Sequence, residues 1–112
     1  MTVVGKGLVV SGSGCSGVGR RADELEQVFA LLKDPGLDEA ILLVESPSAT
    51  AIVPLLSKVR GIVCGDGGMT SHLAIVSREF GLPCVMAAEV GSLADLDGKP
   101  LTVSAEGEIA VG

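Results

Sequence analysis

Short apolar runs separated by turn-forming residues predict a chain rich in β-strands. The run at residues 3–11 is apolar and β-branched, and the run at 40–45 is bounded by turn formers, as is typical of a buried strand. The last two runs are spaced to form a hairpin around residues 105–107. The predicted strands are residues 3–11, 40–45, 61–64, 84–87, 101–104 and 108–111.

Apolar residues with helical spacing predict a helix over residues 23–33. They are Leu25, Val28, Phe29 and Leu32. Pro35 and Gly36 end this pattern. Residues 48–59 predict a second helix, which Pro54 either delays or bends.

A third helix is predicted over residues 70–80. Gly81 suits the left-handed position that ends a helix, and Pro83 prevents continuation. The glycine-rich segment 12–19 predicts a loop between the first strand and the first helix. This order of strands and helices predicts one α/β domain over residues 1–112, built on a compact sheet layer.

Composition and charge exclude several functions. The net charge is −6, the basic residues are scattered, and there are two Phe, no Tyr and no Trp, so neither a basic patch nor a stacking platform for nucleic acid is present. The apolar stretches are well short of the roughly 20 residues that span a bilayer. The N-terminus lacks the pattern of a secretory signal. We therefore expect a cytoplasmic protein that binds neither nucleic acid nor membrane.

The three cysteines, Cys15, Cys64 and Cys84, form no C-x-x-C pair. An odd number with this spacing argues against a disulfide framework and against a zinc site. We expect buried or half-buried free thiols, and no metal bound by this chain.

The only histidine, His72, falls in the first turn of the third predicted helix, after Gly67 and Gly68. Helix starts have unpaired N–H groups and partial positive charge, which favour phosphate and keep an imidazole neutral. The glycines let an anion approach the backbone, and the Thr70 and Ser71 hydroxyls could stabilise it. Thr70 also suits the N-cap. Position alone favours a surface or capping histidine, but it is also compatible with a nucleophile toward phosphorus.

The string GGMTSHLAIVSR at residues 67–78 closely resembles the phosphohistidine signature of phosphoenolpyruvate-utilising enzymes. That family includes pyruvate phosphate dikinase, phosphoenolpyruvate synthase and the first enzyme of the sugar phosphotransferase system. Residues 61–63 and 79–85 resemble its flanking segments, and the resemblance is weakest over 18–48. It implies a swivelling β/β/α domain phosphorylated on His72, which moves between two active sites. In some dikinases the position of Thr70 is a regulatory phosphorylation site.

The chain departs from the family pattern beside the histidine. Leu73 stands where the family usually has a small residue, so it either narrows the approach to the imidazole or packs inward. Cys64-Gly65-Asp66 replaces the commoner sequence before the double glycine. Asp66 adds negative charge near a phosphate, or positions a metal held by a partner. These departures leave the acceptor open.

Two glycine motifs compete with this interpretation. Residues 12–17 have the Gly-x-Gly-x-x-Gly spacing of a dinucleotide site, but the predicted helix begins too late, and Glu45, the nearest acidic residue at a strand end, lies too far along the chain. Residues 14–19 have the spacing of a phosphate loop, but Arg20-Arg21 replaces its Lys-Ser/Thr pair. Neither motif meets its requirements.

The chain is too short to contain a nucleotide-binding domain or an acceptor barrel. We therefore expect a free-standing phosphocarrier, the phosphohistidine subunit of a multi-component phosphotransferase or dikinase. Its partners would be separate kinase and acceptor-binding subunits that hold Mg²⁺. The alternative is a non-catalytic interaction or regulatory module. A fragment of a larger enzyme is a third hypothesis, against which the Met1 start and the end after a strand argue mildly.

Overall fold

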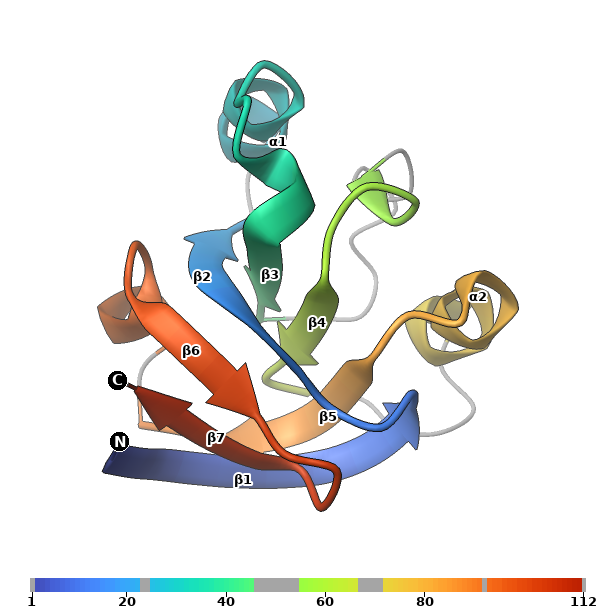
Figure 1. Cartoon of the computed structure of the whole chain (residues 1–112), viewed down its shortest axis with the longest axis vertical. Coiled ribbons are helices and arrows are strands. Elements are labelled where there is room, and N and C mark those ends of the chain that lie inside the picture. Colours follow the sequence, from blue (N-terminus) through green and yellow to red (C-terminus); the bar gives the residue numbers. More distant parts are fainter. Residues whose placement is uncertain (1, 23–24, 46–54, 67–71, 92, 112) are drawn as a thin grey trace.

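The computed structural model describes residues 2–22, 25–45, 55–66, 72–91 and 93–111. Seven strands lie in these ranges: β1 (Thr2–Ser11), β2 (Cys15–Arg21), β3 (Ala40–Val44), β4 (Gly61–Cys64), β5 (Cys84–Glu89), β6 (Pro100–Val103) and β7 (Glu108–Val111). They form a closed barrel in the order β1-β5-β4-β3-β2-β6-β7 (Figure 1). The predicted mixed α/β class is confirmed, and the sheet curls until its two ends meet.

Strand direction divides the barrel into a parallel part and an antiparallel part. Strands β2, β3, β4 and β5 run parallel to their neighbours in this series. Strand β6 runs antiparallel to β2 and β7. The first half of β1 pairs antiparallel with β7, and its second half pairs antiparallel with β5, so β1 closes the barrel.

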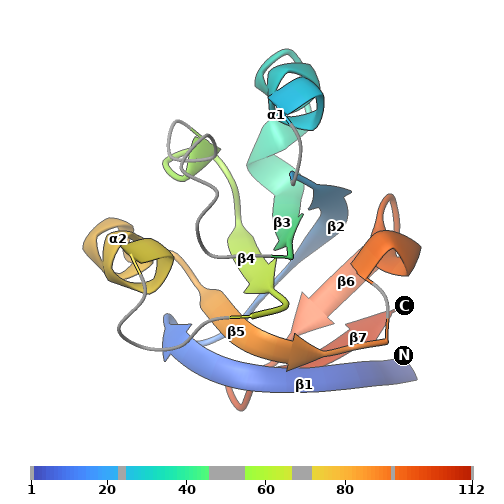
Figure 2. The same cartoon turned by 180° about the vertical axis from the view of Figure 1, so that it is seen from behind.

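Two α-helices, α1 (Leu25–Leu32) and α2 (His72–Phe80), occur in the described part of the chain. Figures 1 and 2 place both of them outside the barrel, on the side of β3, β4 and β5. The short 3₁₀ helices η1 (Leu37–Glu39) and η3 (Leu93–Leu96) precede β3 and β6. The parallel strands thus have apolar neighbours on both faces, as parallel sheets require.

Alternating residues of the strands supply two separate hydrophobic clusters. On β3, Ile41 and Leu43 belong to the cluster inside the barrel, whereas Leu42 and Val44 belong to the cluster beneath the helices. The inner cluster also contains Val63, Val85, Leu93, Leu96, Leu101, Val103 and Ile109. The outer cluster joins Ile62, Cys64, Cys84 and Met86 to Val28, Leu31, Leu55, Leu56, Leu73 and Ala74. Strand β3 is buried throughout, as its continuous apolar run predicts.

The helix predicted over 23–33 is confirmed as α1, but only some of the apolar residues that predicted it are buried. Val28 and Leu31 are buried, whereas Phe29 and Leu32 are 53 % and 41 % exposed. Of the helix predicted over 48–59, residues 46–54 lie outside the described residues. The described remainder is a single turn in which the N–H groups of residues 58 and 59 donate to the residue 55 carbonyl.

The loop predicted over residues 12–19 is wrong from Cys15 onward, because β2 begins there. The glycines of this strand admit neighbouring backbone. A Cβ on Gly17 would overlap the Glu39 carbonyl oxygen, and one on Gly19 would lie 2.5 Å from the Leu96 carbonyl oxygen. The glycines are therefore needed because backbone carbonyl groups of neighbouring segments lie close to β2. Both the dinucleotide motif and the phosphate loop require a helix that begins at these glycines. The strand found there excludes both interpretations.

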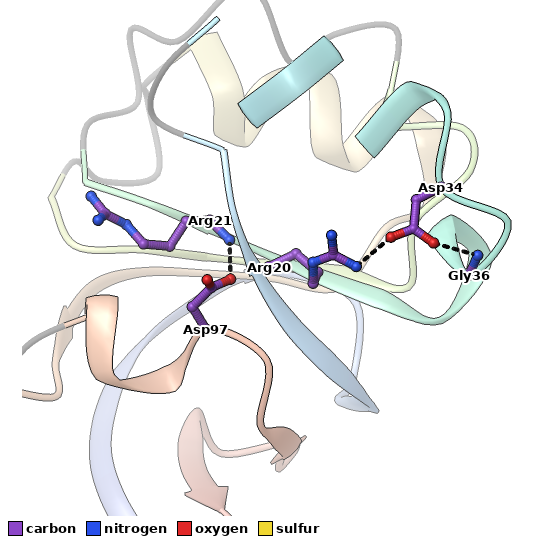
Figure 3. A network of polar contacts seen from close by, with 5 residues as sticks. All are labelled: Arg20, Arg21, Asp34, Gly36 and Asp97. Carbon is purple, nitrogen blue, oxygen red and sulfur yellow. Dashed lines mark hydrogen bonds and ion pairs between the residues drawn. The ribbon is translucent and has the colours of Figure 1, made fainter. Parts of the chain in front are cut away.

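Polar contacts connect β2 to both neighbouring segments (Figure 3). The Arg20 guanidinium pairs with the Asp34 carboxylate after α1, and the Arg21 N–H donates to Asp97 Oδ1 at 3.0 Å. A hydrogen bond from the Gly36 N–H, followed by the Arg20 guanidinium, lowers the pKa of Asp34. Asp97 is exposed, and its carboxylate, in the turn after η3, accepts the hydrogen bond from Arg21.

Gly17→Ala should lower the free energy of unfolding by about 2 kcal/mol, because the added methyl group meets fixed backbone. The matched control is Gly65→Ala, where the nearest atoms would lie at an ordinary 3.5 Å. We expect the control to change stability by less than about 1 kcal/mol. Urea denaturation measures both variants, and equal stability of the two would contradict the close packing of β2.

Candidate functional site at the start of helix α2

The candidate site lies where the parallel strands end. Strand β4 ends at Cys64, and the chain leaves the barrel through Gly65 and the exposed Asp66. Glu45 follows the neighbouring strand β3 and lies beside Gly65. The carboxyl end of parallel strands is where α/β folds commonly bind ligands. Helix α2 begins shortly afterwards, at His72.

The placement of His72 at a helix start agrees with the prediction for the backbone. The predicted phosphate-binding residues Gly67, Gly68, Thr70 and Ser71 lie outside the described residues. Their roles stay predictions, as does the role of the histidine side chain.

The buried face of α2 fixes the helix on the barrel. Leu73 is 4 % exposed, and Ala74 and Ser77 are fully buried. Leu73 thus packs inward. Of the two alternatives that the sequence left open, narrowing the approach to the imidazole and packing inward, the second holds. A bulky residue after the histidine is accommodated in the core.

The C-terminal end of α2 is closed by backbone and side-chain hydrogen bonds. Gly81 has a φ of 65°, and the N–H groups of Gly81 and Leu82 donate to the Arg78 and Ser77 carbonyls. This is the Schellman arrangement, and it confirms the predicted helix end. Arg78 Nε donates to the Val10 carbonyl on β1 at 2.9 Å. The sequence shows a basic residue in the last turn, but its partner on β1 is 68 positions away and could not be predicted.

The thiols near α2 are packing groups. All three cysteines are free, with Cys64 and Cys84 buried and Cys15 half-buried, as predicted. Burial raises the pKa of Cys84 to about 11, although the Ser77 hydroxyl and Arg78 act in the opposite direction. Ser77 Oγ lies near this thiol and has no hydrogen bond of normal geometry in the described structure. Burial likewise raises the pKa of Cys15 to about 11. These two thiols therefore stay protonated at neutral pH and are poor nucleophiles.

Two further observations concern the described ranges alone. They bring together no group of three His, Cys, Asp or Glu side chains with the geometry of a metal site. They also contain no helix with the length and apolar character needed to cross a bilayer.

The geometry defines an α/β-barrel domain with a histidine at the start of a helix that follows a central parallel strand. Residues 37–107 match the family described as PEP-utilising enzyme, mobile domain. This range runs from η1 into the turn between β6 and β7 and includes all of α2. The chain belongs to this family, and the predicted resemblance is confirmed.

Named relatives are much longer than this chain. It is 32 % identical over 99 residues to a probable phosphoenolpyruvate synthase of Archaeoglobus fulgidus, covering 88 % of this chain and 13 % of the relative. It is 31 % identical over 86 residues to the rifampicin phosphotransferase of Bacillus subtilis strain 168, covering 76 % of this chain and 10 % of the relative. The chain thus spans about a tenth of the length of these relatives.

A solved structure shares the fold over nearly the whole chain. Aconitase X of Thermococcus kodakaraensis, in its holo form, superposes with a TM-score of 0.66 and covers 96 % of this chain and 97 % of that chain. The sequence identity is 18 %, so this likeness shows the architecture alone.

Leu73→Ala should lower the free energy of unfolding by about 2–4 kcal/mol, because it removes a buried side chain from the core beneath α2. Ile75→Ala, two positions along the same helix, should cost less than about 1 kcal/mol, because Ile75 is 45 % exposed. Thermal and urea unfolding measure both. A larger loss for Ile75→Ala would mean that α2 packs with its other face inward.

The free energy of unfolding should fall as pH rises from about 9 towards 11. In the unfolded chain the Cys84 thiol loses its proton near its ordinary pKa of 9.0, whereas the folded protein holds it until about 11. Over this window the unfolded state binds fewer protons, so rising pH favours unfolding. Urea titrations at several alkaline pH values measure the slope.

The control for this pH dependence is Cys84→Ala, which should make the slope shallower. Cys15 acts in the same direction, so part of the slope should remain. An unchanged slope in Cys84→Ala would show that this thiol is not protected by burial.

Proposed function

We propose that this chain is a phosphocarrier domain in which His72 accepts a phosphoryl group at a donor site and releases it at an acceptor site. The observation that carries this proposal is the coincidence of the only histidine with the first residue of α2, in a chain of the PEP-utilising mobile-domain family. The partial positive charge of a helix start disfavours an imidazolium, so a neutral ring with a free lone pair is expected at neutral pH.

The proposed transfer proceeds in two balanced steps. In the first, an imidazole nitrogen forms a bond to phosphorus, and the bond from phosphorus to the donor oxygen breaks, with its electrons leaving on the donor. In the second, an acceptor oxygen forms a bond to the same phosphorus and loses any proton it carries to the acceptor site. The nitrogen–phosphorus bond breaks, and its electron pair returns to the imidazole nitrogen. The unpaired N–H groups of a helix start favour the phosphoryl group between the two steps.

The predicted phosphate contacts belong to this proposal. The backbone of Gly67 and Gly68 would allow the phosphoryl group to approach, and the hydroxyls of Thr70 and Ser71 would donate hydrogen bonds to it. Magnesium belongs to the partner sites, where it offsets the charge of the donor phosphates.

The relatives suggest the classes of donor and acceptor. A phosphoenolpyruvate synthase and a rifampicin phosphotransferase both contain a segment similar to this chain. We accordingly infer that the donor is ATP or phosphoenolpyruvate, and that the acceptor is pyruvate or a compound with a hydroxyl group. The chain spans about a tenth of these relatives, so both sites are assigned to other units, between which the domain would swivel.

The alternative is an interaction module that keeps the fold without carrying phosphate. Two departures from the family pattern bear on it, Leu73 and the altered segment from Cys64 to Asp66. Leu73 no longer favours the interaction module, because its side chain is 4 % exposed and packs in the core. The segment before the double glycine is what remains in its favour.

Incubation with the donor unit and ATP or phosphoenolpyruvate should add one acid-labile phosphate, because a phosphohistidine hydrolyses readily in acid. Intact-mass spectrometry before and after acid treatment measures this. His72→Ala should abolish the gain. Its matched control is Ser77→Ala, a buried position later in the same helix, which should leave the gain unchanged. An acid-stable phosphate, or one that persists in His72→Ala, would refute the carrier role.

A further inference from the structure

The outward face of α2 carries an exposed apolar side chain three residues after position 72. This residue, Ile75, is 45 % exposed, whereas Val76 is half-buried and packs against the core cluster beneath the helix. Residues spaced by three lie on one face of a helix. Glu79, four residues beyond Ile75, is exposed and continues the same face. The buried residues Leu73 and Ser77 occupy the opposite side.

Isolated exposed apolar side chains are common on protein surfaces, so exposure alone does not indicate a binding site. The chain has other such residues, including Phe29 and Leu32 on α1. What distinguishes Ile75 is its position one helical turn after the proposed phosphoryl carrier.

Phosphoryl transfer itself requires this face to be covered. The attacking nitrogen has to come within roughly 3–3.5 Å of the donor phosphorus, in a site from which water is excluded. A protein that surrounds the first residue of α2 this closely contacts Ile75 next. The covering surface then needs an apolar contact at Ile75.

Charge indicates what surrounds this apolar contact. The chain carries a net charge of −6, Glu79 is exposed on this face, and Asp66 is exposed after β4. A surface that binds a phosphate-bearing donor and this acidic domain has to be basic, because like charges across an interface are repulsive.

We propose that Ile75 is the docking residue through which the domain binds its phosphoryl-donor unit, whose surface is apolar opposite Ile75 and rich in Lys and Arg around it. This inference rests on the proposed function. It goes further by assigning partner recognition to the outward face of α2, separately from the phosphorylated residue.

The test compares Ile75→Glu with the matched control Leu32→Glu. Leu32 is an aliphatic residue of similar exposure, 41 %, on the other helix. Phosphorylation of each variant is followed by intact mass against protein concentration, with the purified donor unit and ATP or phosphoenolpyruvate. We expect the kcat/KM of Ile75→Glu to fall about tenfold or more, mainly through KM, because an interface anchor typically contributes this much. Leu32→Glu should stay within about twofold of the wild type.

A second arm separates docking from the chemistry of the histidine. Phosphoramidate, a small molecule that needs no docking surface, should phosphorylate wild type, Ile75→Glu and Leu32→Glu at similar rates. An equal fall in kcat/KM with the donor unit in both variants would overturn the docking proposal. An unchanged kcat/KM in Ile75→Glu would overturn it as well. A wild type that accepts phosphate from phosphoramidate but not from the donor unit would refute this partner. A wild type that accepts none from either source would refute the carrier function itself.

Discussion

Closure of the barrel by β1 is the constraint on which the position of the candidate site depends. Strand β1 pairs with β5 and β7, and a Cβ on Gly5 or Gly7 would collide with the Glu89 or Met86 carbonyl oxygen of β5. The register also shifts along this pair, where Ala87 adopts a φ of 52°. Helix α2 packs on both β1 and β5. The position of α2 therefore depends on the pairing of β1 with β5, two strands that are far apart in sequence.

The two faces of α2 have different roles in the proposed carrier. The inward face holds the helix through Leu73, Ala74 and Ser77, and Arg78 adds a hydrogen bond to β1. The thiol of Cys84 beneath the helix is protonated at neutral pH and does not compete as a nucleophile. The outward face stays available for a partner. A phosphocarrier needs this combination, because the reactive group has to stay fixed relative to the surface that docks.

Much of the fold could be predicted from local patterns. Apolar runs predicted the strands other than β2, and Gly81 predicted the end of α2, because both depend on short-range sequence. The loop over residues 12–19 was mispredicted because Gly17 accommodates the distant Glu39 backbone, which no local pattern reveals. Barrel closure depends on pairing between remote strands. In the site, the sequence located His72 and left two alternatives for Leu73, which only tertiary packing could resolve. The phosphate contacts predicted at 67, 68, 70 and 71 stay predictions.

The central claim is that the imidazole of His72 forms a bond to phosphorus. Because the chain has one histidine, ³¹P NMR of protein labelled with ¹⁵N in histidine tests it most directly. After incubation with the donor unit and its phosphoryl donor, the account predicts one phosphoramidate resonance that is coupled to a histidine ring nitrogen. A phosphorus resonance on a hydroxyl or carboxylate oxygen, with the histidine nitrogens unchanged, would contradict it.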